Sequence, residues 1–161
     1  MEQNARKQRV AVYCHFIVGS EDQPTGREAQ KTYYTQEISK NPDWEMVGFY
    51  ADPGIRGAAR KNRAKFDKMI AACKRRDIDI IITRSASRFA RNMADCMEIV
   101  RMLKFYGVGV IFEREGISTL TEFGEMYLSL FSNLVQKETE VTAQKHPGSF
   151  QCRYGCVHIL G

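Results

Sequence analysis

The run Ile78-Asp79-Ile80-Ile81-Ile82-Thr83, followed by Ser85-Ala86-Ser87-Arg88-Phe89-Ala90-Arg91-Asn92, decides the fold of this chain. The apolar run predicts a buried strand, and the basic segment predicts a loop and a helix start beyond its carboxyl end. Ligands of open α/β sheets bind at that edge. Arg88 and Arg91 are three residues apart, so at a helix start they would share one face. Their fixed positive charge predicts a phosphate ligand.

Strand and helix patterns alternate on both sides of this stretch. Strands are expected at residues 9–17, 46–51, 77–83 and 108–112, and helices at 27–39, 63–75 and 92–106. This order predicts a three-layer α/β domain, in which a mostly parallel sheet of four to five strands carries helices on both faces. Residues 52–62 are rich in Gly, Ala, Lys and Arg without periodicity, so we expect a long mobile loop there.

A longer helix is expected at residues 121–145. Its apolar side chains recur at spacings of three and four and are Phe123, Met126, Tyr127, Leu130, Phe131, Leu134, Val135 and Val141. At 1.5 Å per residue this helix would be roughly 35 Å long, which exceeds the need of a small sheet. The stripe could pack on its own domain, but the length favours contact with a second subunit. We expect residues 1–145 to form the domain and residues 146–161 an irregular tail.

Composition and charge restrict the protein's class. The 161 residues suffice for one domain with a real core, and the net charge of +5 with a pI near 9.0 is compatible with a nucleic-acid partner without establishing one. No segment approaches the ~20 apolar residues of a membrane span. Residues 1–9 are polar and contain no signal-peptide core, so a cytoplasmic protein without membrane contact is expected.

The odd number of cysteines indicates free thiols. Cys152, Cys156 and His158 could offer three soft metal ligands, but no fourth ligand stands at a usual zinc spacing. The alternative is a set of unpaired thiols in the tail. We expect neither a metal nor another cofactor.

Several motifs, in this order and spacing, resemble the catalytic domain of the serine recombinases, the resolvase/invertase family. They are Val10-Ala11-Val12-Tyr13-Cys14, Glu28-Ala29-Gln30, Tyr50-Ala51-Asp52-Pro53-Gly54-Ile55, Asn62-Arg63 with Phe66, Asp79 to Thr83 leading into Ser87 to Asn92, Val108-Gly109-Val110 and Gly124-Glu125. The resemblance covers residues 9–145 and is strongest to large transposon and phage-type members. It implies site-specific DNA recombination by a protein that works as a dimer or tetramer.

The reaction implied by the resemblance is a phosphoryl transfer. A serine hydroxyl attacks a DNA phosphodiester, forms a 5′-phosphoserine bond and releases a 3′ hydroxyl; subunits then exchange and the steps reverse. The phosphoserine bond conserves the energy of the phosphodiester, so no metal or nucleotide cofactor is implied. Without a metal, the extra negative charge on the phosphate must be neutralised by side chains, for which arginine is well suited.

The resemblance also implies a set of phosphate-site residues. Arg88 and Arg91 match the family's paired arginines, Arg63 matches a third, and Gln30 and Asp79 match polar residues that help to hold this cluster. Structural alternatives exist for most of them. The paired arginines could form a solvated basic helix start, Asp79 a strand-end cap, and Gln30 an exposed helix polar residue.

The sequence departs from the family where catalysis begins. After Tyr and Cys the family continues Arg-Val-Ser, whereas this chain places His15 at the arginine position and Ile17 at the nucleophile position. Isoleucine has no lone pair, so the covalent step cannot occur at Ile17. Ser20 lies three residues further, roughly 10 Å in extended chain, and is a weak substitute. Ser85 and Ser87 are expected to serve loop hydrogen bonding and helix capping.

These patterns favour a serine recombinase domain that is defective in catalysis. Pro147 and Gly148 interrupt the last helix and the chain ends at Gly161, so we expect a truncated copy that lacks the DNA-binding region of large members. One alternative is a non-catalytic or decayed fragment that dimerises with, and regulates, an intact recombinase. Another is a small-molecule-binding α/β domain, which the absence of a glycine-rich loop after the first strand disfavours.

Overall fold

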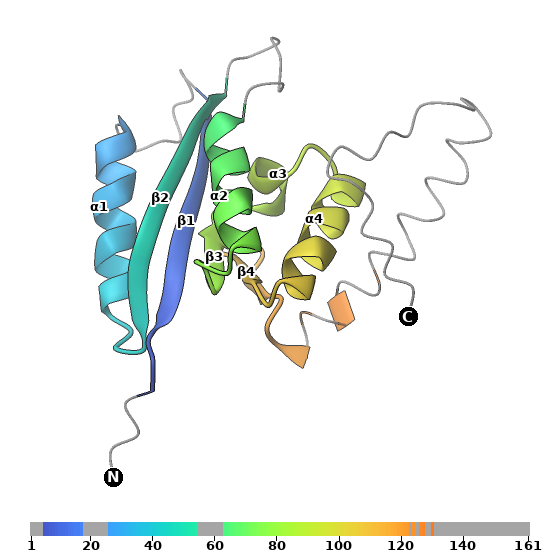
Figure 1. Cartoon of the computed structure of the whole chain (residues 1–161). Coiled ribbons are helices and arrows are strands. Elements are labelled where there is room, and N and C mark those ends of the chain that lie inside the picture. The colour runs from blue at the N-terminus through green and yellow to red at the C-terminus, as the bar shows by residue number, and fades with distance from the viewer. Residues whose placement is uncertain are drawn as a thin grey trace, which may run out of the picture.

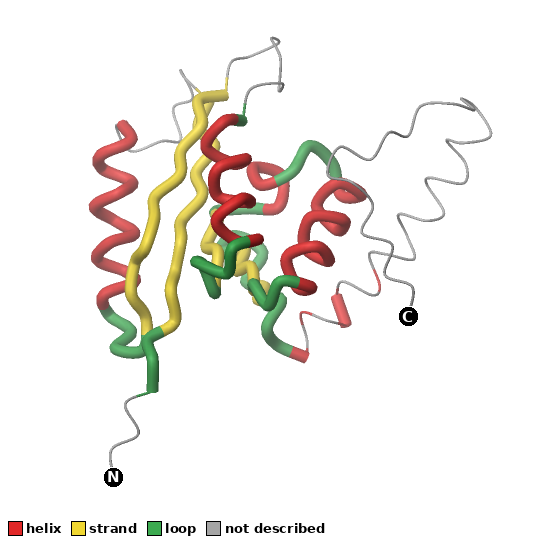
Figure 2. Tube along the Cα trace, in the orientation of Figure 1, coloured by secondary structure: helices red, strands yellow, loops and turns green. Residues whose placement is uncertain are grey.

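A computed structural model of the chain describes residues 5–17, 26–54 and 63–122, together with residues 124, 126, 127 and 130. Strands and helices alternate through most of these ranges (Figures 1 and 2). The strands are β1 (Gln8–Ile17), β2 (Trp44–Gly54), β3 (Ile80–Thr83), β4 (Gly109–Phe112) and β5 (Ile117–Ser118). The helices are α1 (Gly26–Ser39), α2 (Ala64–Lys74), α3 (Ala86–Phe89) and α4 (Met93–Phe105).

The strands form one five-stranded sheet in the order β2-β1-β3-β4-β5. β1 pairs in parallel with β2 and β3, β3 pairs in parallel with β4, and only the short β5 is antiparallel to its neighbour. Figure 1 shows α1 on one face of the sheet and α2, α3 and α4 on the other. The predicted three-layer α/β architecture is therefore confirmed, including its mostly parallel sheet.

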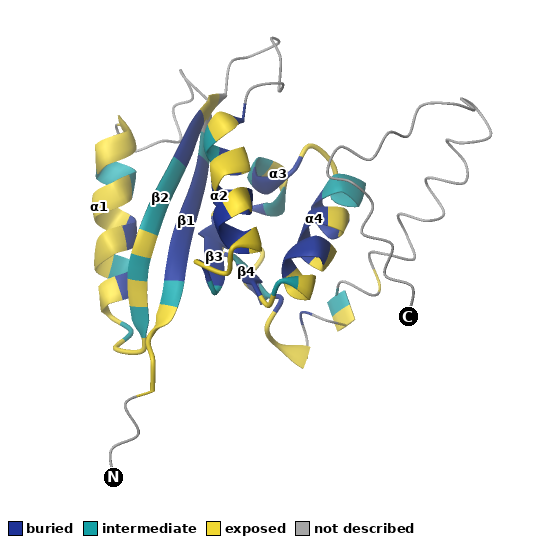
Figure 3. Ribbon diagram, viewed as in Figure 1, coloured by how far each residue is buried: buried dark blue, intermediate teal, exposed yellow. Residues whose placement is uncertain are grey.

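The core divides into two layers because successive strand residues point to opposite faces. Val10 and Val12 of β1 pack with Tyr34 and Ile38 of α1, whereas Tyr13 belongs to the cluster under α2, α3 and α4. Figure 3 shows β1 buried along most of its length between the two layers. The carboxyl ends of β1, β3 and β4 consequently meet at one edge of a rigid sheet.

The basic segment after β3 folds differently from its prediction. The Ser85 hydroxyl accepts a hydrogen bond from the Arg88 N–H and caps α3, while the Asn92 side chain accepts one from the Asp95 N–H and caps α4. Two caps seven residues apart divide the segment into two helices. Arg88 lies in α3 and Arg91 in the turn that follows it, so the prediction that they share one helix face is wrong.

The first turn of the predicted long helix packs directly against β5. Glu122, Gly124, Met126, Tyr127 and Leu130 are helical. A Cβ atom at position 124 would lie 1.9 Å from the Ser118 carbonyl oxygen, so only glycine permits this approach. The continuation of the helix to residue 145 and the tail with its cysteines lie outside the described residues.

Other expectations from the sequence agree with the structure only in part. Residues 52–54, expected in a loop, belong to β2, because Asp52, Pro53 and Gly54 continue the register against β1. Residues 55–62 lie outside the described ranges. Among the described residues, no helix is long and apolar enough to cross a membrane, and no cluster of side chains suits a metal ion.

Candidate functional site

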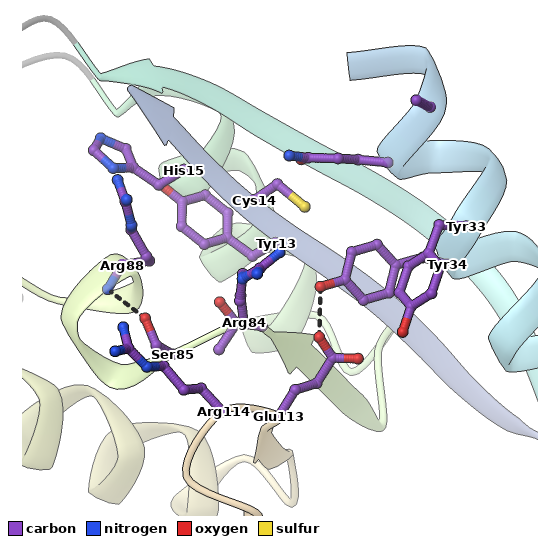
Figure 4. Close-up of a pocket in the computed structure, with 13 residues that line it drawn as sticks. Tyr13, Cys14, His15, Tyr33, Tyr34, Arg84, Ser85, Arg88, Glu113 and Arg114 are labelled. Atoms are coloured by element: carbon purple, nitrogen blue, oxygen red, sulfur yellow. Dashed lines mark hydrogen bonds between the residues drawn. The ribbon is translucent and has the colours of Figure 1, made fainter. Parts of the chain in front are cut away.

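A cleft of about 820 Å³ opens at the carboxyl edge of the sheet (Figure 4). β1, α1 and the segments that follow β3 and β4 all contribute to its walls. Its lining residues are Tyr13, Cys14, His15, Ala29, Gln30, Tyr33, Tyr34, Thr83, Arg84, Ser85, Arg88, Glu113 and Arg114. This edge is where the fold class binds ligands, so the cleft is the main candidate for a functional site.

Arg88 is positioned in the cleft by the cap of α3. The buried Ser85 hydroxyl lies 3.3 Å from the Arg88 nitrogen and 3.0 Å from the Ser87 hydroxyl, which fixes the first turn of the helix. Figure 4 shows the Arg88 side chain extending toward His15 on β1. The Arg88 guanidinium forms no ion pair with any residue in the described part of the chain. A phosphate group would supply the missing negative charge.

Arg63 lies in the core next to the cleft and does not line it. Its side chain is buried, with its residue only 7% exposed, and its guanidinium carbon lies 3.8 Å from the Phe66 ring centroid. Its Nε donates a hydrogen bond of 3.1 Å to the Tyr13 hydroxyl, and its Nη2 donates to the Phe89 carbonyl oxygen. Arg63 therefore supports Tyr13 and the turn after α3 from beneath.

Asp52 is the residue that completes this buried cluster, and the sequence interpretation gave it no role. It is 3% exposed and accepts hydrogen bonds from the N–H groups of Lys65 (3.0 Å) and Phe66 (2.9 Å) and from the Tyr13 hydroxyl (3.3 Å). Arg63, at the N-cap position of α2, provides no side-chain cap, so the Asp52 carboxylate replaces it. The available signal was an acidic residue directly after an apolar strand pattern.

Among the described residues, Cys14 is the only thiol that lines the cleft. Burial raises the pKa of this thiol to about 12, which the nearby Glu113 carboxylate reinforces. Cys14 is thus protonated near neutral pH, and a protonated thiol is a poor nucleophile. The described cleft therefore offers charge to bind an anion but no thiolate to attack one.

Residues 12–147 match the family described as "Resolvase, N terminal domain". The chain belongs to this family. Its curated relatives include the "Transposon Tn3 resolvase" of Escherichia coli and of Klebsiella pneumoniae, each 32% identical over 60 residues that cover 37% of this chain and 32% of the relative. The matched part is about a third of the length of these relatives.

Solved structures resemble this resolvase domain along most of its length. One is a resolvase family site-specific recombinase from Streptococcus pneumoniae, with 27% identity, a TM-score of 0.70 and coverage of 86% of this chain and 93% of that one. Another is the N-terminal catalytic domain of TP901-1 integrase, with 20% identity, a TM-score of 0.66 and coverage of 83% and 98%. The second likeness concerns the fold alone.

Asp79 does not lie at the cleft of the resolvase domain. It precedes β3 at the amino end of the strand, where its carboxylate accepts hydrogen bonds from the Arg9 side chain (3.0 Å) and the Arg9 N–H (2.8 Å). The Arg9 guanidinium lowers the pKa of Asp79 below its ordinary value. The expectation that Asp79 holds the arginine cluster is wrong, because the length of β3 separates it from the carboxyl edge.

The other expected site residues of the resolvase domain fall into three groups. Gln30 lines the cleft from α1, Arg88 from α3 and His15 from β1. Arg91 is exposed on the turn between α3 and α4 and is absent from the lining of the cleft. Ile17 is the last residue of β1, opposite Gly54 of β2, and Ser20 lies outside the described residues.

Proposed function

We propose that this chain is a catalytically defective strand-exchange domain of the serine recombinase type, which takes part in site-specific DNA recombination in the cytoplasm. Membership of the resolvase family supports the proposal, as do the recombinase functions named for its relatives. The observation that carries it is Arg88, a guanidinium without an ion pair among the described residues, in a cleft at the carboxyl edge of the sheet. Its partner is a phosphate of the DNA backbone.

We further propose that this copy binds the phosphate without cutting the strand. Arg88 and Gln30 act inside the cleft, Arg63 supports Tyr13 and the end of α3 from beneath it, and Arg91 contacts the DNA outside the cleft. At the nucleophile position, Ile17 has no hydroxyl to attack phosphorus. His15 replaces an arginine, whose planar guanidinium is always charged and can bind two phosphate oxygens at once, so it stabilises the phosphate less. The reaction implied by the family requires no cofactor, and none is proposed.

The wild-type protein is expected to bind DNA without forming a covalent bond to it. The test is incubation with supercoiled plasmid DNA, followed by denaturation in detergent and a search for protein attached to DNA. A gel-shift assay before denaturation serves as the control, because it shows that the DNA was bound. A covalent adduct mapped to any serine, including Ser20, Ser85 or Ser87, would contradict the proposal.

We infer that the domain associates with a second subunit through residues 121–145. Met126 and Leu130 are four residues apart on the start of this helix and are 53% and 56% exposed. Residues at that spacing share one helix face, and exposed apolar faces of this kind mark association surfaces. The second subunit is another copy of this chain or an intact recombinase, which this copy would then regulate.

Leu130→Asp is expected to convert a dimer of this protein into a monomer. A carboxylate on the buried face of a helix pair would lose its hydration without gaining a partner. Sedimentation velocity measures the mass, and Tyr33→Asp is the matched control, since Tyr33 is exposed on α1. A wild-type protein that is monomeric at micromolar concentration, or a dimer that Leu130→Asp leaves intact, would refute the helix contact.

A further inference from the structure

Two arginines in the cleft have no part in the function proposed so far. Arg84 follows β3 directly, and Arg114 follows β4 after one residue. The backbone pairing of these strands continues past their ends, since the Glu113 N–H donates to the Thr83 carbonyl (3.1 Å) and the Arg114 N–H to the Arg84 carbonyl (2.8 Å). The backbones of Arg84 and Arg114 therefore lie side by side at the edge of the sheet, and Figure 4 shows the Arg114 side chain extending toward Ser85 and the Arg84 side chain extending on the side of Tyr34.

Neither arginine is neutralised within the described part of the protein. Both residues are exposed, and neither forms an ion pair with residues 5–17, 26–54 or 63–122. Glu113 is the one acidic residue among the described residues of the lining, but its carboxylate accepts a 2.7 Å hydrogen bond from the Tyr34 hydroxyl. Tyr34 stays protonated, because burial and this hydrogen bond raise its pKa well above the ordinary value. The hydrogen bond between Tyr34 and Glu113 thus joins α1 to the segment after β4.

Among the described lining residues, the positive charge exceeds what one phosphate can balance. Arg84, Arg88 and Arg114 contribute three positive charges against the single carboxylate of Glu113. A DNA phosphodiester carries one negative charge, so a single phosphate at Arg88 leaves positive charge unbalanced. Thr83 is fully buried in the wall, and its hydroxyl has no hydrogen-bond partner among the described residues. The cleft therefore offers both charge and a hydrogen-bonding group to a longer anion.

We propose that Arg84 and Arg114 form a second site for the DNA backbone, in which each arginine contacts one further phosphate beside the phosphate held at Arg88. This inference rests on the proposed function and extends it. The ligand class is a nucleic-acid strand with several phosphates in sequence. The second site holds the strand in register across the carboxyl edge of the sheet, because backbone contacts fix the position of a protein on DNA.

The test measures how salt weakens binding to a fluorescein-labelled DNA duplex. Each arginine that neutralises a phosphate adds about 0.9 to the slope of log affinity against log salt. The double variant Arg84→Gln/Arg114→Gln is expected to lower that slope by about two. Raising the salt from about 50 to 200 mM should therefore weaken DNA binding about tenfold less in this variant than in the wild type. Its thermal midpoint should match the wild type, since neither side chain forms an ion pair in the described structure.

The matched control is Lys68→Gln/Lys74→Gln, which removes the same charge from exposed positions on α2. A double arginine variant that behaves like this control overturns the second site. Arg88→Gln separates the two proposals. If Arg88→Gln weakens DNA binding but Arg84→Gln/Arg114→Gln does not, the proposed function is retained and the second site is rejected. If Arg88→Gln also has no effect, or the wild type fails to bind DNA, both fall. Protection from thermal unfolding by inorganic pyrophosphate without DNA binding would assign the pair to a small phosphate ligand instead.

Discussion

His15→Arg combined with Ile17→Ser is expected to produce a covalent protein–DNA adduct where the wild type produces none. The substitutions return a hydroxyl to the end of β1 and a permanent cation beside Arg88. Loss of the nucleophile alone costs on the order of 10⁶ in rate for sites that act as a unit, so its return has a comparable effect. The measurement is the detergent-resistant adduct on supercoiled DNA, mapped by mass spectrometry to position 17.

The matched control is His15→Arg combined with Ile17→Ala, which carries the same cation and a small side chain without a hydroxyl. Only the serine variant should form the adduct, although both should bind DNA equally well. An adduct from both variants would show that another residue attacks the phosphate. If no adduct forms although DNA binding is normal, the other residues of the cleft do not suffice for DNA cleavage, and the prediction is wrong.

Asp52→Ala is expected to lower the free energy of unfolding by about 3 kcal/mol, as measured by urea denaturation. The substitution removes the acceptor for two N–H groups at the start of α2 and for the Tyr13 hydroxyl. It also removes negative charge from the surroundings of the buried Arg63 guanidinium. Loss of a helix cap alone accounts for about 1 kcal/mol, so the larger expected value depends on the buried cluster.

Asp43→Ala is the control for this measurement, because Asp43 is exposed and should change stability by less than about 0.5 kcal/mol. Asp52→Asn should lie between the two, since its amide keeps the shape and one acceptor oxygen but loses the charge. A loss below about 1 kcal/mol for Asp52→Ala would mean that water or a rearranged side chain satisfies the three donors.

The sequence predicted the sheet well because β-branched runs bounded by turn residues have few alternatives. The run at residues 80–82 is fully buried, and the motifs around it identified the family. Arg88 was expected at this edge from its position after the strand, and Gln30 from the resemblance to the family; both line the cleft. Local pattern therefore sufficed for the edge of the sheet and for the position of Arg88, whereas the position of Gln30 needed the family motif.

Residues whose roles depend on distant partners were harder to predict. Asp79 looked like a site residue because of its motif, but its partner Arg9 is 70 residues away in sequence and lies at the opposite end of β3. Asp52 caps a helix that begins 12 residues later, so no local capping pattern reveals it. Arg91 lies outside the cleft because two helix caps, at Ser85 and Asn92, divide the one expected helix into two.

The close contact between Gly124 and the Ser118 carbonyl has a geometric consequence for any assembly of this domain. Backbone lies directly on backbone at this joint, so no flexible side chain intervenes between the sheet and the helix that leaves it. The direction of departure is set by the sheet itself. A subunit that binds the face of Met126 and Leu130 would therefore be attached within a few residues of the edge strand β5, through a contact that only glycine permits.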